Sequence, residues 1–75
     1  MKHLRKRSFS LGGHRTSVAL EAEFWAALEA MAQRRAVSLS ALVAQVDADR
    51  ADPSLPLASA LRVLALREAG NHQSD

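Results

Sequence analysis

One short segment of the chain alternates as a β-strand does, and it constrains the fold more than any other feature. Residues 15–20 place Thr16, Val18 and Leu20 on one face and Arg15, Ser17 and Ala19 on the other. A strand needs a partner for its backbone N–H and C=O groups, and a two-stranded ribbon needs helices beneath it. Two copies of the segment, paired antiparallel across a two-fold axis, give each strand a partner, and the helices that follow in the two chains lie beneath the ribbon. The segment therefore predicts a homodimer whose antiparallel ribbon takes one strand from each chain.

Helical patterns follow the strand, so the predicted fold is mostly α with one short strand per chain. Apolar residues recur at intervals of three and four over residues 22–35. Ser38 is a good N-cap for a second helix, which the proline-containing residues 52–56 must end. A third helix is predicted over residues 57–69, with Gly70 as its stop. This helix is apolar over most of its surface, so we expect the dimer core or another protein to cover it.

The composition limits the kind of protein this can be. The chain has 75 residues and no cysteine, and a chain of that length buries only about 60% of its unfolded surface. Its three histidines are too far apart to form a local metal site, so self-association is expected to enlarge the core. No membrane span or secretory signal is expected, and the absence of cysteine favours the cytoplasm. No arrangement of catalytic residues is recognisable, so no enzyme activity, cofactor or metal is predicted.

The modest net charge of +2 hides a strong segregation along the chain. Residues 1–20 contain five basic residues and no acid, a formal charge of +5. Residues 21–75 contain five basic residues and eight acids, a formal charge of −3, and together the two segments give the chain's +2. The N-terminal segment is therefore predicted to face a polyanion, and the helical part is not.

The first twelve residues allow two interpretations. In the first, residues 1–12 are a flexible basic arm, followed by the folded core at 13–51, a linker and third helix at 52–70, and a disordered tail at 71–75. In the second, Gly12-Gly13 forms a turn, and the residues before it fold back onto the strand as a hairpin. A hairpin would widen the ribbon of the dimer to four strands and change which edge is free for pairing.

Residues 15–46 resemble a ribbon-helix-helix domain. The resemblance rests on the alternating strand, on the Leu28-x-x-Met31-Ala32 pattern, and on the Ser-Leu-Ser-Ala-Leu-Val sequence at 38–43. A narrower resemblance over about residues 5–67 is to a bacterial subgroup of these proteins with an added C-terminal helix. It rests on Phe24-Trp25 and on the third-helix pattern Leu57-x-Ser59-Ala60-Leu61-Arg62-Val63-x-x-Leu66.

The resemblance implies a homodimeric, sequence-specific DNA-binding transcriptional regulator, a repressor associated with the nucleoid, whose ribbon enters the major groove. The base contacts it implies are Arg15, Ser17 and Ala19. The expected phosphate contacts, from the basic segment and the start of the second helix, are Lys2, Arg5, Lys6, Arg7, His14, Ser38, Leu39 and Ser40. The expected dimer core consists of Val18, Leu20, Trp25, Leu28, Leu42, Val43 and Val46.

Two residues depart from the family pattern. Ala19 stands where family members often have a polar or basic residue, which leaves few specifying groups on the ribbon. Ala36 stands where the family usually has glycine, which implies a strained or differently shaped turn. The third helix also supports an alternative function, an antitoxin or protein-interaction adapter that binds a protein partner through this helix.

Overall fold

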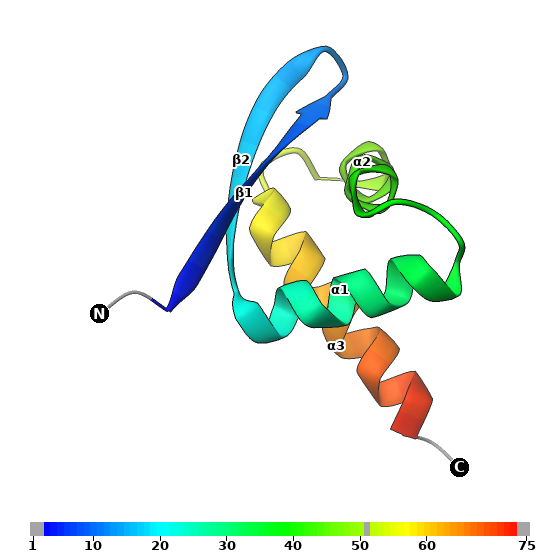
Figure 1. Ribbon diagram of the computed structural model, residues 1–75. Helices are drawn as coiled ribbons and strands as arrows, with labels where there is room; N and C mark the ends of the chain where they lie inside the picture. Colours follow the sequence, from blue (N-terminus) through cyan, green and yellow to red (C-terminus); the bar gives the residue numbers. More distant parts are fainter. Residues whose placement is uncertain (1–2, 51, 74–75) are drawn as a thin grey trace.

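The computed structural model describes residues 3–50 and 52–73, which form a two-stranded antiparallel sheet followed by three helices (Figure 1). None of the helices described there is long and apolar enough to cross a membrane. The five elements are β1 (Leu4–Leu11), β2 (His14–Glu21), α1 (Ala22–Arg34), α2 (Leu39–Asp49) and α3 (Leu57–Gln73).

The strand predicted for residues 15–20 is longer than expected, and its partner lies in the same chain. β1 pairs with β2 from Leu4 opposite Glu21 to Leu11 opposite His14. Gly12 and Gly13 connect the strands with φ angles of 55° and 84°. A two-residue type I′ turn requires positive φ at both central residues, which glycine adopts without steric cost.

The expectation of a flexible arm is therefore wrong for residues 4–11, and the hairpin interpretation is correct. The expectation of one strand per chain is wrong as well, since β2 finds backbone partners in β1. The physical reason is local: a two-glycine turn brings β1 back at small entropic cost, whereas a second chain must be recruited from solution.

The three predicted helices are confirmed, with one change at the C-terminus. The Ser38 hydroxyl oxygen accepts a hydrogen bond from the Ala41 backbone N–H at 3.0 Å, which confirms the predicted N-cap of α2. Gly70 does not end α3, which continues to Gln73. The expected disordered tail is therefore wrong for residues 71–73, because a glycine costs a helix only about 1 kcal/mol relative to alanine.

The turn between α1 and α2 is built around Ala36, which has a φ of 57°. The Val37 N–H donates to the Ala32 carbonyl oxygen at 3.0 Å, and the Ala36 N–H donates to that of Gln33 at 3.1 Å. This is the hydrogen-bond pattern of a Schellman motif, whose left-handed position is usually glycine. The strain expected at Ala36 is therefore present in the backbone.

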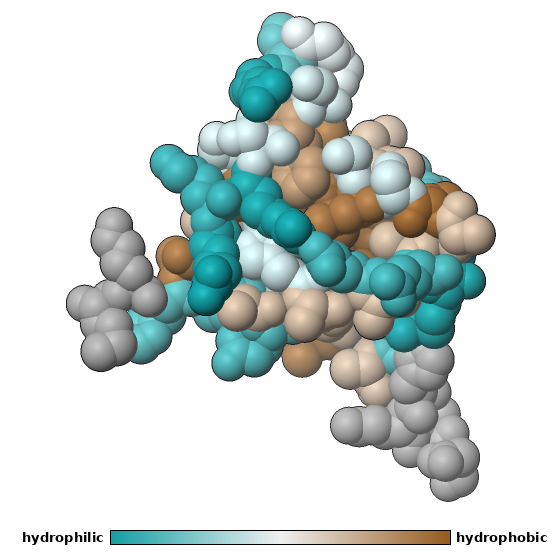
Figure 2. Space-filling model, in the orientation of Figure 1, coloured by the Kyte–Doolittle hydropathy of each residue, from teal (hydrophilic) through white to brown (hydrophobic). Residues whose placement is uncertain are grey.

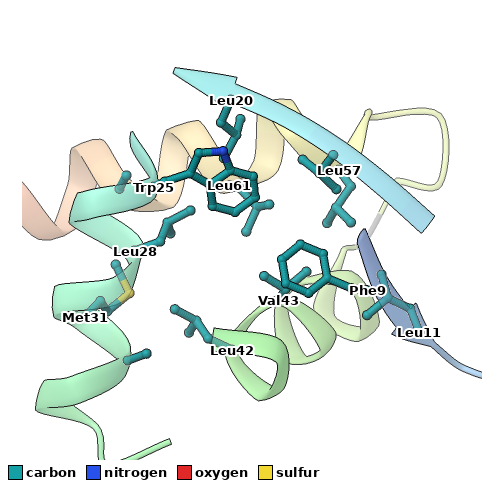
Figure 3. Packing of buried hydrophobic residues seen from close by; sticks show 13 residues of the cluster. Phe9, Leu11, Leu20, Trp25, Leu28, Met31, Leu42, Val43, Leu57 and Leu61 are labelled. Atoms are coloured by element: carbon teal, nitrogen blue, oxygen red, sulfur yellow. The ribbon is translucent and has the colours of Figure 1, made fainter. Parts of the chain in front are cut away.

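One chain supplies a continuous core from all five elements (Figure 3). The sheet contributes its inner face, and α3 contributes a face that was expected to need a cover from outside. The Phe9 and Trp25 rings lie 5.9 Å apart, between the hairpin and α1. The buried residues are Phe9, Leu11, Val18, Leu20, Trp25, Leu28, Met31, Ala32, Leu42, Val43, Leu57, Leu61 and Ala65.

Candidate nucleic-acid interface

The face of β2 that turns away from the core carries the side chains predicted to contact bases. Successive side chains of a strand alternate between its two faces, and Val18 and Leu20 are buried. Arg15 and Ser17 are exposed on the opposite face, and Ala19 there is half-buried. The structure therefore brings the three residues together on one surface, and their contact with DNA stays a prediction.

β1 adds three more polar side chains to the same surface. Residues that pair directly in an antiparallel sheet share a face, and the pairs here are Lys6 with Ala19, Ser8 with Ser17, and Ser10 with Arg15. We call these six residues the outer face.

The hydroxyl oxygens of Ser8 and Ser17 are 3.2 Å apart, which agrees with this register. Sequence reasoning treated Lys6 as part of an arm and missed Ser8 and Ser10 altogether. The two glycines of the turn were the only signal that could have placed them here.

Arg7 lies on the inner face of the hairpin and is bound to the protein itself. Its guanidinium donates to a Glu29 carboxylate oxygen at 2.7 Å and lies 5.3 Å from the centroid of the Trp25 ring. The Trp25 indole N–H donates to the Arg5 carbonyl oxygen at 2.8 Å. These contacts hold β1 against α1, and the phosphate contact predicted for Arg7 stays a prediction. They also place Trp25 in the core of one chain.

Positive charge without an internal partner gathers on the hairpin. Five described arginines have a carboxylate oxygen within 4.0 Å, and all but Arg7 lie in the helices or next to them. The described lysine and arginine residues with no such partner are Arg5, Lys6, Arg15 and Arg67. Three of these four belong to the hairpin, which carries a hydrophilic surface in Figure 2.

The one acidic residue of the hairpin is held by α3. Glu21, the last residue of β2, accepts a hydrogen bond from Arg62 at 3.0 Å. A backbone hydrogen bond at Glu21 itself, and then the Arg62 guanidinium, lower the pKa of this carboxyl below its usual value. Its negative charge is therefore paired at the end of the hairpin far from Arg15.

The N-terminus of α2 contains three predicted phosphate contacts. The hydroxyl of Ser38 caps the helix, Leu39 is half-buried, and Ser40 is exposed. Capping needs no ligand, so a phosphate at this position stays a prediction.

The other predicted phosphate contacts lie on the hairpin or before it. His14 is exposed next to the turn, opposite Leu11, and Arg5 is exposed one residue before Lys6. Lys2 lies outside the described residues.

Most residues predicted for the dimer core are buried within one chain. The exception is Val46, which is half-buried against the core. β1 and α3 of the same chain pack on these residues. The sequence analysis left β1 open as an arm or a hairpin strand, and α3 open as part of the dimer core or as a helix that binds another protein. The buried members are Val18, Leu20, Trp25, Leu28, Leu42 and Val43.

A family model described as the ribbon-helix-helix domain matches residues 4–69, which include both strands and most of α3. No curated protein and no solved structure matches the chain.

Proposed function

Since the chain belongs to the ribbon-helix-helix domain family, we propose that it is a sequence-specific, DNA-binding regulator of transcription. It acts as a homodimer and represses by occupying an operator. The outer face of the hairpin turns toward the bases of the major groove, where each base pair presents a distinct pattern of hydrogen-bond groups.

The observation that supports this proposal best is the charge on the hairpin. Arg15 and Lys6 extend from the outer face with no carboxylate partner among the described residues. A guanidinium can donate two hydrogen bonds to a guanine, and serine hydroxyls can donate or accept. The same surface therefore offers both attraction to a polyanion and groups that distinguish bases.

The first test is selection of bound fragments from random duplex DNA, followed by binding of the selected sequence and of random DNA by wild type and by Arg15→Ala. A bidentate contact to guanine is worth about 1–3 kcal/mol, so we expect the variant to lose about fivefold or more in discrimination. Affinity of the wild type should fall steeply with salt, since binding to phosphates releases counterions.

Arg67→Ala is the matched control. It removes another arginine that has no carboxylate partner among the described residues, from the C-terminal half of α3, which points away from the hairpin (Figure 1). Discrimination should survive this change. Enrichment of no sequence by the wild type at any salt concentration would overturn the proposed function, and unchanged discrimination by Arg15→Ala would remove Arg15 from the reading surface.

The dimer is tested separately by sedimentation or light scattering over a range of concentrations, with and without DNA. A monomer under all conditions would contradict the homodimer without contradicting DNA binding.

The alternative function, an antitoxin or adapter, is supported by Val63 and Leu66 of α3, which are 46% and 64% exposed. Co-purification of a defined partner that is lost on Leu66→Ser would favour this alternative.

A further inference from the structure

The register of the hairpin places Lys6 beside the one β2 residue of the outer face whose side chain cannot form a hydrogen bond. Lys6 is paired with Ala19 and lies on the same outward face. Neighbouring strands are about 4.8 Å apart, so the long, flexible side chain of a lysine on β1 can reach the area in front of the Ala19 methyl group. The other strand of the same chain can thus offer a polar group where Ala19 has none.

From this juxtaposition we propose that Lys6 is a base-reading residue, and that the half-site read by one chain has a guanine at each end, one for Lys6 and one for Arg15. The proposal rests on the proposed function, and it adds the base chemistry of the target. It also changes the role of Lys6 from a phosphate contact to a determinant of specificity.

The charge of Lys6 has no carboxylate partner among the described residues, whereas that of its neighbour Arg7 is paired with Glu29. Lys6 is exposed and has no carboxylate oxygen within 4.0 Å among the described residues. Arg7 turns to the opposite face and is bound by Glu29 and Trp25. The same alternation that buries Phe9 on the inner face therefore directs Lys6 outward.

The side-chain chemistry determines which base each end prefers. Lysine and arginine are donors only, and guanine is the base that offers two acceptors, N7 and O6, in the major groove. The serines between them can donate or accept, so they discriminate less. We therefore expect strong preferences at the two ends of the half-site and weak preferences between them.

The geometry of the strand gives the separation of the two guanines. Ala19 and Lys6 lie four residues along the hairpin from Arg15 and Ser10. At about 3.3 Å per residue this is about 13 Å, and base pairs follow one another at about 3.4 Å. The two preferred guanines, on the same or on opposite strands, are thus about four base pairs apart.

The experiment is selection from random duplex DNA with three folded proteins: wild type, Lys6→Ala and Arg5→Ala. Arg5→Ala is the matched control, because it removes an exposed cation one residue away in β1 on the opposite face. Wild type should enrich two guanines about four base pairs apart. Lys6→Ala should reduce the preference for one of them at least fivefold and keep the other, whereas Arg5→Ala should keep both and weaken all sequences equally.

A fourth protein, Lys6→Gln, tests the chemistry of the contact. Glutamine pairs best with adenine in the major groove, so the preference at the Lys6 end should shift from guanine toward adenine. If Lys6→Ala and Lys6→Gln select the wild-type motif, the role of Lys6 is wrong while the proposed function stands. If wild type selects no motif, the proposed function fails, and this inference fails with it.

Discussion

At the scale of single residues, the strained position is Ala36. A residue with a Cβ pays about 1–2 kcal/mol to adopt the left-handed region, and Ala36 does so at a φ of 57°. Glycine would remove this cost but would add about 0.4–1 kcal/mol of entropy to the unfolded chain. We therefore expect Ala36→Gly to raise the free energy of unfolding by about 0.5–1 kcal/mol.

Thermal unfolding followed by circular dichroism measures this effect. A gain of that size should raise the melting temperature by about 2–8 °C in a domain of this length. Ala30→Gly is the control: this residue is exposed in the middle of α1, and glycine there should destabilise the protein by about 1 kcal/mol. A lower melting temperature for Ala36→Gly would show that the turn is not strained.

At the scale of elements, β2 and α3 are joined by the ion pair of Glu21 and Arg62, whose closest oxygen and nitrogen atoms are 3.0 Å apart. The pKa of Glu21 is lowered in the folded protein, first by a backbone hydrogen bond and then by Arg62. A carboxyl whose pKa is lower in the folded state stabilises the fold above its unfolded pKa, and this contribution disappears as the pH falls through the folded pKa.

We therefore expect Glu21→Gln to be less stable than wild type at pH 7, with the difference shrinking as the pH falls below about 4.5. Urea denaturation at a series of pH values measures it. In an Arg62→Gln background the difference at pH 7 should be smaller, because one of the two causes is absent. A difference of the same size at pH 7 and pH 3 would contradict this account.

The elements also show how far sequence reasoning extends. The three helices follow from apolar spacing, and the start of α2 follows from Ser38, because these signals are local. β1 has a weaker signal, the Gly12-Gly13 turn, because only Phe9 and Leu11 of its eight residues are buried. Its position depends on Trp25 and Glu29, which are 20 and 22 residues away in sequence from their partners in β1. The surface of β2 could thus be predicted, whereas the three side chains that β1 adds to it follow only from the hairpin interpretation, which the sequence left open beside the flexible arm.

At the scale of the whole molecule, α3 belongs to the core rather than to an appendage. Its residues Leu57, Leu61 and Ala65 are buried against the other elements. Loss of one buried leucine costs about 2–5 kcal/mol, and an entire domain is stable by only about 5–15 kcal/mol. A chain that ends after Asp52 is therefore expected to lose cooperative folding.

Thermal unfolding of the truncated chain, compared with the full chain, measures this loss. Leu66→Ser is the control, because this side chain is 64% exposed in the same helix and its replacement should change the free energy of unfolding by about 0.5 kcal/mol or less. A sharp, wild-type transition in the truncated chain would show that α3 is dispensable for the fold.

The tight turn at Gly12 and Gly13 also limits how this protein can evolve. Along β1, the residues of the outer face alternate with those that enter the core. DNA recognition and folding therefore depend on the same register of the strand. One extra residue at the turn would shift the register, turning Phe9 to the solvent and Lys6 inward. Most surface loops tolerate such insertions, but an insertion in this turn would change which side chains face the DNA. We expect descendants of this chain to change their operators by substitution within the strands, and to keep a turn of two residues.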